Sequence, residues 1–233
     1  MRLNGNRELP GGARLIQVAT TLAAQAQPGH WFRLRLDTRE LTLPALDASP
    51  REGWIAFQLA APVGQHIRHL PYGSPCTLHG PLGAAFPPPV GDRRRLLLVD
   101  ETGLACALFS STVAAVSPTL VLAELSTTPP PVRLCPSRFL VTGLPPGAIA
   151  GLAPLESAGI ASRTAHPAGL PGCADGDINT LLDAWLDHRS AQERWQACAT
   201  VAGSEDFVER VESRLRGRVG QHRGYPPPTT PGY

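Results

Sequence analysis

The sequence of 233 residues contains no lysine, and all 21 of its basic side chains are arginine. Schiff-base catalysis and the P-loop phosphate site both depend on a lysine amine, so the sequence excludes both. Any phosphate group that the protein binds must therefore be held by arginine side chains or by backbone N–H groups.

Cysteine is also scarce, and its spacing excludes the common cysteine-rich metal motifs. The five cysteines are far apart in the chain and include no C-x-x-C pair. Zinc sites and iron–sulfur clusters need ligands that cluster in the sequence, and the histidines show no H-E-x-x-H spacing, so we predict no metal site. We interpret the cysteines as buried, reduced thiols; they are Cys76, Cys106, Cys135, Cys173 and Cys198.

Long hydrophobic runs and an excess of charge are both missing. No apolar run reaches the roughly 18 residues of a membrane helix, and residues 1–12 are too polar for a signal peptide, so we expect a cytoplasmic protein without a membrane span. A charged fraction of 17% and a net charge of +2 argue against a nucleic-acid binder. The length favours two compact units of roughly 100 residues each.

The densest cluster of proline and glycine, residues 87–92, predicts a boundary between two halves. Before it, short strand-like stretches are separated by turn residues, which is typical of a small antiparallel barrel. In residues 31–36 the side chains of Phe32, Leu34 and Leu36 alternate with arginines, so we expect the apolar three to face inward. We predict a six-stranded antiparallel barrel over residues 1–88.

After the boundary the pattern changes to strands alternating with helices. The predicted strands are continuous apolar runs, which indicate a parallel sheet covered on both faces; they are residues 96–99, 119–125, 139–141 and 200–202. The predicted helices are residues 103–116, 147–158, 178–188 and 205–216. We predict an α/β domain of the nucleotide-binding type over residues 93–220. The proline-rich tail, residues 221–233, is either a disordered end or an extended arm.

Three segments of the first half resemble motifs of the ferredoxin reductase-like flavoproteins. They are Pro28-Gly29-His30-Trp31-Phe32, Arg39-Glu40-Leu41-Thr42, and the run from Gly80 to Phe86. Within that family the sequence is most similar to the electron-transfer subunit of dihydroorotate dehydrogenase and its bacterial relatives. Their second domain carries segments similar to residues 136–145, 159–163 and 172–176.

The resemblance implies a flavin site in the first half. In the family motif the arginine binds the flavin phosphate and the hydroxyl residue bonds the isoalloxazine ring, which assigns these roles to Arg39 and Thr42. Leu41 stands where the family has an aromatic residue against the ring. Gly64 begins the stretch that corresponds to the family's Gly-x-Gly-Thr contact with the pyrophosphate.

The resemblance also implies a site for a nicotinamide nucleotide in the second half. Thr102 and Gly103 remain from its first glycine-rich turn, and Gly203 and Glu205 remain from its later Cys-Gly-Pro-Glu motif. The two carboxylates before Thr102, Asp100 and Glu101, would either repel a dinucleotide or cap the helix that follows. The same Asp-Glu-Thr turn resembles that of the related siderophore-interacting reductases, which would be consistent with a retained function.

Two functions are consistent with these observations. The first is a flavin-dependent NAD(P)H oxidoreductase or electron-transfer subunit that binds FAD or FMN and acts with a protein redox partner or within a complex. It would lack the family's [2Fe–2S] cluster, because no cysteine follows Cys198. The second is a non-catalytic binding or assembly subunit that keeps the two-domain fold, since several cofactor-contacting residues of the family are replaced. In the first case Tyr225 or Tyr233 of the tail would stack on the flavin in place of the aromatic that Leu41 replaces.

Overall fold

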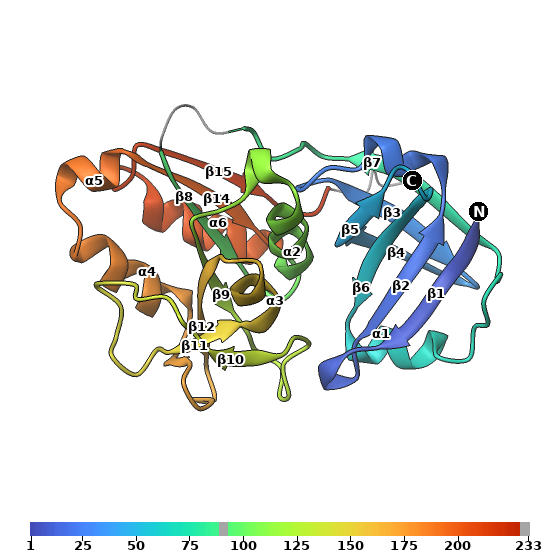
Figure 1. Ribbon diagram of the computed structural model, residues 1–233, viewed down its shortest axis with the longest axis horizontal. Helices are drawn as coiled ribbons and strands as arrows, with labels where there is room; N and C mark the ends of the chain where they lie inside the picture. The colour runs from blue at the N-terminus through green and yellow to red at the C-terminus, as the bar shows by residue number, and fades with distance from the viewer. Residues whose placement is uncertain (89–92, 229–233) are drawn as a thin grey trace.

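The computed structural model describes residues 1–88 and 93–228. It shows two halves side by side along the long axis of the molecule (Figure 1), in agreement with the predicted fold class of antiparallel sheets followed by a parallel sheet. None of the helices in these residues is long and apolar enough to cross a membrane.

The first half is an antiparallel, barrel-like unit of seven strands in two sheets, rather than the six strands predicted. One sheet has the order β1-β2-β6-β5 and the other has the order β4-β3-β7. A single bridge between Arg2 and Pro75 joins the two sheets at one edge. The strands are β1 (Arg2–Glu8), β2 (Arg14–Ala19), β3 (Trp31–Leu36), β4 (Arg39–Pro44), β5 (Asp47–Ser49), β6 (Trp54–Leu59) and β7 (Cys76–Leu82).

The alternation predicted for β3 is confirmed. Phe32, Leu34 and Leu36 are buried in the core between the two sheets. In an antiparallel pair directly opposed residues share a face, so Leu41 and Leu43 of β4, which oppose Leu34 and Phe32, also face this core. The face that carries Thr42 is therefore the opposite, outer one.

The second half is a sheet of six parallel strands in the order β13-β12-β9-β8-β14-β15. The strands are β8 (Arg94–Val99), β9 (Leu120–Glu124), β12 (Ala161–His166), β13 (Ala174–Asp175), β14 (Ala197–Ala202) and β15 (Gln221–Tyr225). A short antiparallel pair, β10 (Leu134–Pro136) and β11 (Ala150–Leu152), lies beside it. The order reverses between β8 and β14, which makes their carboxyl ends the topological switch point of the sheet.

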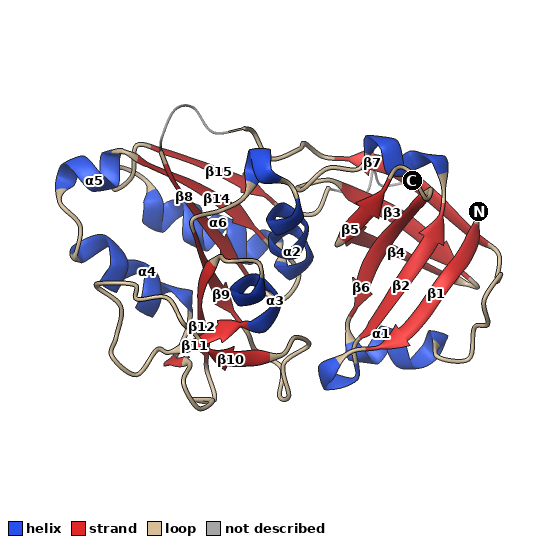
Figure 2. Ribbon diagram, in the orientation of Figure 1, coloured by secondary structure: helices blue, strands red, loops and turns tan. Residues whose placement is uncertain are grey.

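Helices cover both faces of this sheet, as Figure 2 shows. Leu96 and Leu98 pack with the helices α4 and α6, whereas Leu97 and Val99 pack with α2 and α3 on the other face. Two covered faces explain why β8 is apolar from Leu96 to Val99, after the two arginines that begin it. The helices are α1 (Ala61–Ile67), α2 (Leu104–Thr112), α3 (Ala153–Ser157), α4 (Ile178–Asp187), α5 (Ala191–Trp195) and α6 (Glu205–Leu215).

Three expectations about individual elements were wrong. Residues 139–141 form a loop in which Leu140 is 92% exposed, and the strand of that region is instead β12. The sequence hid β12 because Ser162, Arg163, Thr164 and His166 are polar, although all four are buried and hydrogen-bonded.

The other two errors concern a helix and the tail. Residues 147–158 contain a strand, β11, before the short helix α3, which begins with Pro154 in its first turn. Residues 221–225, predicted as the start of the tail, form β15, and every residue of β15 pairs with a residue of β14. Strand β15 was missed because His222, Arg223 and Gly224 give it no apolar run.

Candidate cofactor cleft between the two halves

A cleft of about 470 Å³ lies between the halves and opens at the carboxyl end of the parallel sheet. Its walls are the end of β4, the segment that leads from β6 into α1, the start of α2, and the loop that follows β9. The lining residues are Gly11, Thr42, Leu43, Pro44, Gln58, Ala60, Ala61, Pro62, Glu101, Thr102, Ala105, Thr127, Thr128, Pro129 and Pro131. Glu101 is the only charged side chain among these described residues.

Two of the predicted site residues meet in this cleft. Thr42 lies on β4 in the first half, and Thr102 lies in the turn before α2 in the second half. They are 60 positions apart in the sequence, so only the approach of the two halves brings their hydroxyl groups to one cavity. Domain interfaces and switch points are the usual places for a ligand in such folds.

Three other residues predicted for the flavin lie outside the cleft walls. Arg39 is exposed at the far end of β4, about 10 Å along the strand from Thr42 at 3.3 Å per residue. Leu41 packs against the core of the first half. Gly64 is buried inside α1, where a Cβ would lie 2.9 Å from Cγ of Arg14, so its lack of a side chain allows α1 to pack on β2.

The first turn of α1 faces the cleft, whereas Gly64, the residue expected there, does not. Ala61 and Pro62 form its first turn and line the cavity, and no side chain caps it. Proline has no N–H, so this helix end offers one donor fewer than a glycine-rich turn would offer a phosphate.

Glu101 shapes the opposite wall of the cleft. Its Oε1 accepts hydrogen bonds from the backbone N–H groups of Ser126 and Thr127, at 2.8 and 2.7 Å, and from the Thr127 hydroxyl at 2.8 Å. The buried His166 supports the same loop, because its Nε2 lies 3.2 Å from the carbonyl oxygen of Thr127 while its Nδ1 accepts from the Ala168 N–H at 3.1 Å. Glu101 is therefore a structural clamp on the loop that closes the cleft.

Asp100 occupies the switch point itself. Its Oδ1 accepts from the N–H of Gly103, at 2.9 Å, and its Oδ2 accepts from the N–H and the hydroxyl of Ser204, at 2.9 and 2.6 Å. These N–H groups belong to the turns that begin α2 and α6, where the partial positive charge of a helix attracts an anion. The carboxylate of this chain is therefore the anion at both helix ends.

Two glycines make this arrangement possible. A Cβ on Gly203 would lie 2.5 Å from Oδ1 of Asp100, and a Cβ on Gly103 would overlap the carbonyl oxygen of Ala202. Both residues are thus needed for the close approach of β14 to the turn after β8. Neither lines the cleft described above.

Glu205 lies in a separate cavity of about 290 Å³ beside the end of β15. The residues that share this cavity come from both halves and include Trp31, Arg223 and Tyr225. Tyr225 is buried, and its ring packs edge-on against Phe86 with centroids 4.7 Å apart. Tyr233, the other aromatic expected near a flavin, lies outside the described residues.

These contacts allow a test of each expected cofactor. An isoalloxazine ring fits the cleft, which has apolar walls and hydroxyl or amide groups from Thr42, Thr102 and Gln58. The flavin phosphates have no arginine in the cleft walls and would have to extend outward to Arg39. The pyrophosphate of a nicotinamide dinucleotide fits poorly at the start of α2, because Asp100 already accepts from the Gly103 N–H there and its charge repels a second anion.

Sequence reasoning anticipated part of this site. Helix capping by Asp100 was one of its two alternatives; Asp100 accepts from the N–H of Gly103 just before α2, whereas no side chain caps the first turn of that helix. Gln58 and His166 carried no signal, because single polar residues in a strand give none. The cysteines agree with the expectation of free thiols: Cys76, Cys106 and Cys173 are buried, and the other two are half-buried.

Comparisons with known proteins detect the fold but no close relative. No family description matches the sequence, and no curated protein is similar to it in sequence. The ferredoxin reductase of carbazole 1,9a-dioxygenase superposes with a TM-score of 0.72 at 16% identity, covering 97% of this chain and 68% of that one.

Two further solved structures agree over nearly their whole length. The cytochrome b5 reductase domain of Ulva prolifera nitrate reductase gives a TM-score of 0.63 at 10% identity and covers 95% of both chains. A ferredoxin NADP+ reductase from Neisseria gonorrhoeae, with bound FAD and NADP, gives 0.58 at 9% identity and covers 96% of both. The closer relation to the dihydroorotate dehydrogenase subunit stays a prediction. The protein has the ferredoxin reductase-like fold that these flavoproteins share.

Proposed function

We propose that the protein is a flavin-dependent oxidoreductase or electron-transfer protein, with the flavin ring in the cleft between its two halves. The observation that carries the proposal is the meeting of Thr42 and Thr102, from different halves, on the walls of one largely apolar cleft. The family resemblance assigns Thr42 to the flavin and Thr102 to the nicotinamide nucleotide, and in this fold both line the same cleft.

Within this proposal each wall has a defined role. Leu43 and Pro44 provide apolar surface for the ring, and the Thr42 hydroxyl hydrogen-bonds its edge. Arg39, which makes no hydrogen bond or ion pair with any described residue, binds the phosphate of FMN or FAD outside the cleft. A bound flavin supplies hydride and single-electron transfer, and the protein supplies position and electrostatics.

The electron donor in this proposal is a protein partner. The nicotinamide donor that the sequence suggested, with contacts at Thr102, Gly103, Gly203 and Glu205, requires an anion site that Asp100 occupies. A partner protein, or another subunit of a complex, can deliver electrons to a flavin without that site.

The test is a titration of the purified protein with riboflavin, FMN and FAD, followed by quenching of flavin fluorescence. Riboflavin lacks the phosphate, so the ratio of its affinity to that of FMN measures the phosphate contact alone. We expect FMN to bind about five- to tenfold more tightly, which corresponds to about 1 kcal/mol for a solvent-exposed charge-assisted hydrogen bond.

Two variants complete the design. Arg39→Gln should equalise the affinities for FMN and riboflavin, whereas Arg51→Gln, which changes another exposed arginine on the first half, should leave the ratio unchanged. Failure of all three flavins to bind the wild-type protein would reject the proposal.

A second candidate function rests on a specific observation. Pro62 at the start of α1, and Glu101 as the only charged side chain among the described residues of the cleft, both weaken a phosphate site. They favour a non-catalytic binding or assembly subunit that keeps the fold. Such a protein would be isolated with a partner and would reduce no artificial electron acceptor in the presence of flavin and reductant.

A further inference from the structure

A second and larger cavity, of about 700 Å³, lies on the other side of the contact between the two halves. Gln58 and Pro131 separate it from the cofactor cleft: the side-chain amide of Gln58 donates to the carbonyl oxygen of Pro131 at 3.4 Å, and these two residues line both spaces. Thr42, Glu101 and Thr102 of the cofactor cleft do not line this second cavity. No role proposed so far uses it.

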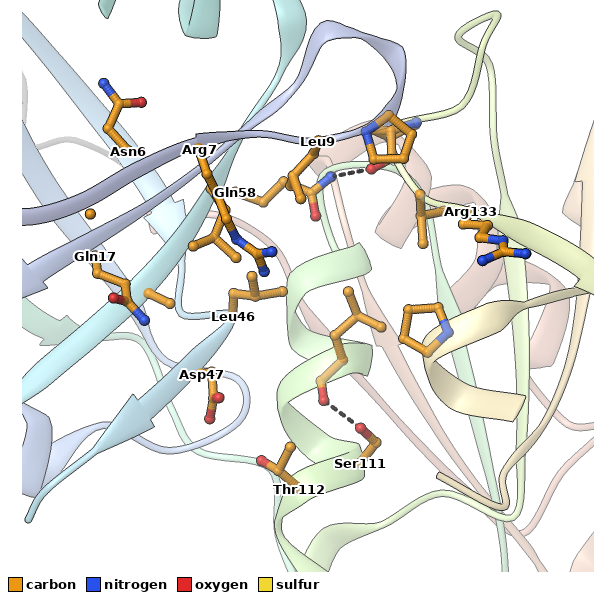
Figure 3. Close-up of a pocket in the computed structure, with 18 of the residues that line it drawn as sticks. Asn6, Arg7, Leu9, Gln17, Leu46, Asp47, Gln58, Ser111, Thr112 and Arg133 are labelled. Atoms are coloured by element: carbon orange, nitrogen blue, oxygen red, sulfur yellow. Dashed lines mark hydrogen bonds between the residues drawn. The ribbon is translucent and has the colours of Figure 1, made fainter. Parts of the chain in front are cut away.

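The walls of this cavity come from both halves. One wall is the outer face of the sheet β1-β2-β6-β5, and the other is the carboxyl-terminal part of α2 with the segments around Val132 and Pro154 (Figure 3). Most of the wall surface is apolar. The apolar side chains are Leu9, Pro10, Leu15, Leu46, Trp54, Ala56, Leu108, Pro131, Val132, Pro154 and Ala158.

The hydroxyl groups on α2 are not free to bind a polar ligand strongly. Ser111 donates to the carbonyl oxygen of Leu108 at 2.6 Å, and Thr112 donates to that of Phe109 at 2.9 Å. Both bonds return to the helix backbone, so this wall presents mainly methyl and methylene groups.

One cation points into the apolar space. Figure 3 shows the Arg7 side chain reaching from β1 toward α2 across the cavity. Its guanidinium makes no hydrogen bond and no ion pair with any residue that the structure describes. Arginine stays charged at all ordinary pH values and matches the geometry of a carboxylate, so it is an unused anion partner at an apolar surface.

The carboxyl group in the cavity does not compete for that role. Asp47 lies on β5 and its Oδ1 accepts from the N–H of Ala48 at 2.8 Å. Burial raises the pKa of the Asp47 carboxyl above its ordinary value. The third charged residue, Arg133, is also basic.

We propose that this cavity is a second binding site, which takes a small organic acid with an apolar body and holds its carboxylate at Arg7. The volume lies within the range of about 300–1,000 Å³ that is typical of small-molecule sites. Because its walls belong to both halves, the ligand contacts both and strengthens their association.

The probes are decanoate and 1-decanol, which share an alkyl chain and differ in the carboxylate. Binding is measured by calorimetry below the critical micelle concentration. We expect decanoate to bind the wild-type protein about tenfold more tightly than decanol, because only the acid engages Arg7. Saturating decanoate should also raise the melting temperature of the protein.

Three variants separate the contributions. Arg7→Gln should reduce the affinity for decanoate about tenfold and leave that for decanol unchanged, and Arg51→Gln should change neither. Leu108→Trp fills the cavity from α2 and should abolish binding of both probes. Absence of decanoate binding to the wild-type protein, or equal decanoate affinity of the wild type and Arg7→Gln, would overturn the proposal. Either result leaves the flavin titration unaffected, because Arg7 lies outside the cofactor cleft.

Discussion

Replacing Asp100 with alanine removes one carboxylate that serves two helices. In the wild-type protein this side chain accepts from the N–H groups of Gly103 and Ser204 and from the Ser204 hydroxyl. The variant leaves both N–H groups without this partner, at the point where α2 and α6 begin. We expect it to be folded but clearly less stable.

The structure sets the size of the effect. A typical intramolecular hydrogen bond contributes about 1 kcal/mol to stability, and here the three bonds that Asp100 accepts are lost together. The free energy of unfolding should therefore fall by about 2–3 kcal/mol. Asp206→Ala is the matched control: Asp206 lies in the first turn of α6, is exposed and makes no hydrogen bond to a described residue, so its loss should cost less than about 0.5 kcal/mol.

Urea unfolding followed by circular dichroism gives both free energies. The same samples test whether Asp100 excludes anions: inorganic pyrophosphate should raise the melting temperature of Asp100→Ala and leave that of the wild type unchanged. Equal stability of Asp100→Ala and Asp206→Ala would refute the stabilising role of these hydrogen bonds. Stabilisation of the wild type by NADH or pyrophosphate at micromolar concentrations would refute the exclusion.

Three further predictions concern single side chains. Burial raises the pKa of Cys106 to about 12, so Ellman's reagent should leave this thiol unmodified in the folded protein and modify the half-buried Cys135 and Cys198. The number of thiols modified should therefore be the same in the wild type and in Cys106→Ala. Hydrogen bonds from two arginines lower the pKa of Asp183 below 3.8, so Asp183→Asn should cost up to about 1 kcal/mol of stability at neutral pH. This difference in stability should persist above about pH 4 and disappear as the pH falls below the pKa of Asp183 in the folded protein. A difference that instead grew in acid would contradict the assignment. Glu101→Ala should release the loop of residues 126–131, so proteolytic cleavage within this loop should become faster and flavin binding weaker. An unchanged rate of cleavage would show that Glu101 does not hold this loop.

Much of the fold was predictable from local pattern. Strand β3 alternates because one of its faces is buried, and residues 96–99 of β8 are all apolar because both faces of the strand are covered there. Such signals depend only on neighbours along the chain. Strand β12 lacked them, because its polar side chains bond to residues distant in the sequence, such as Phe139 for Arg163 and Thr127 for His166. Strand β15 lacked them because it has no apolar run.

The candidate sites divide in the same way. The motif around Arg39 and Thr42 could be read from residue order, and so could the carboxylates before Thr102. Whether Asp100 repels a nucleotide or only bonds the start of a helix was undecidable from the sequence, because its Ser204 partner is 104 positions away. The cavity at Arg7 was likewise invisible, since a space between two halves exists only once they pack. Local periodicity determines the elements, and long-range approach of the two halves decides which side chains share a site.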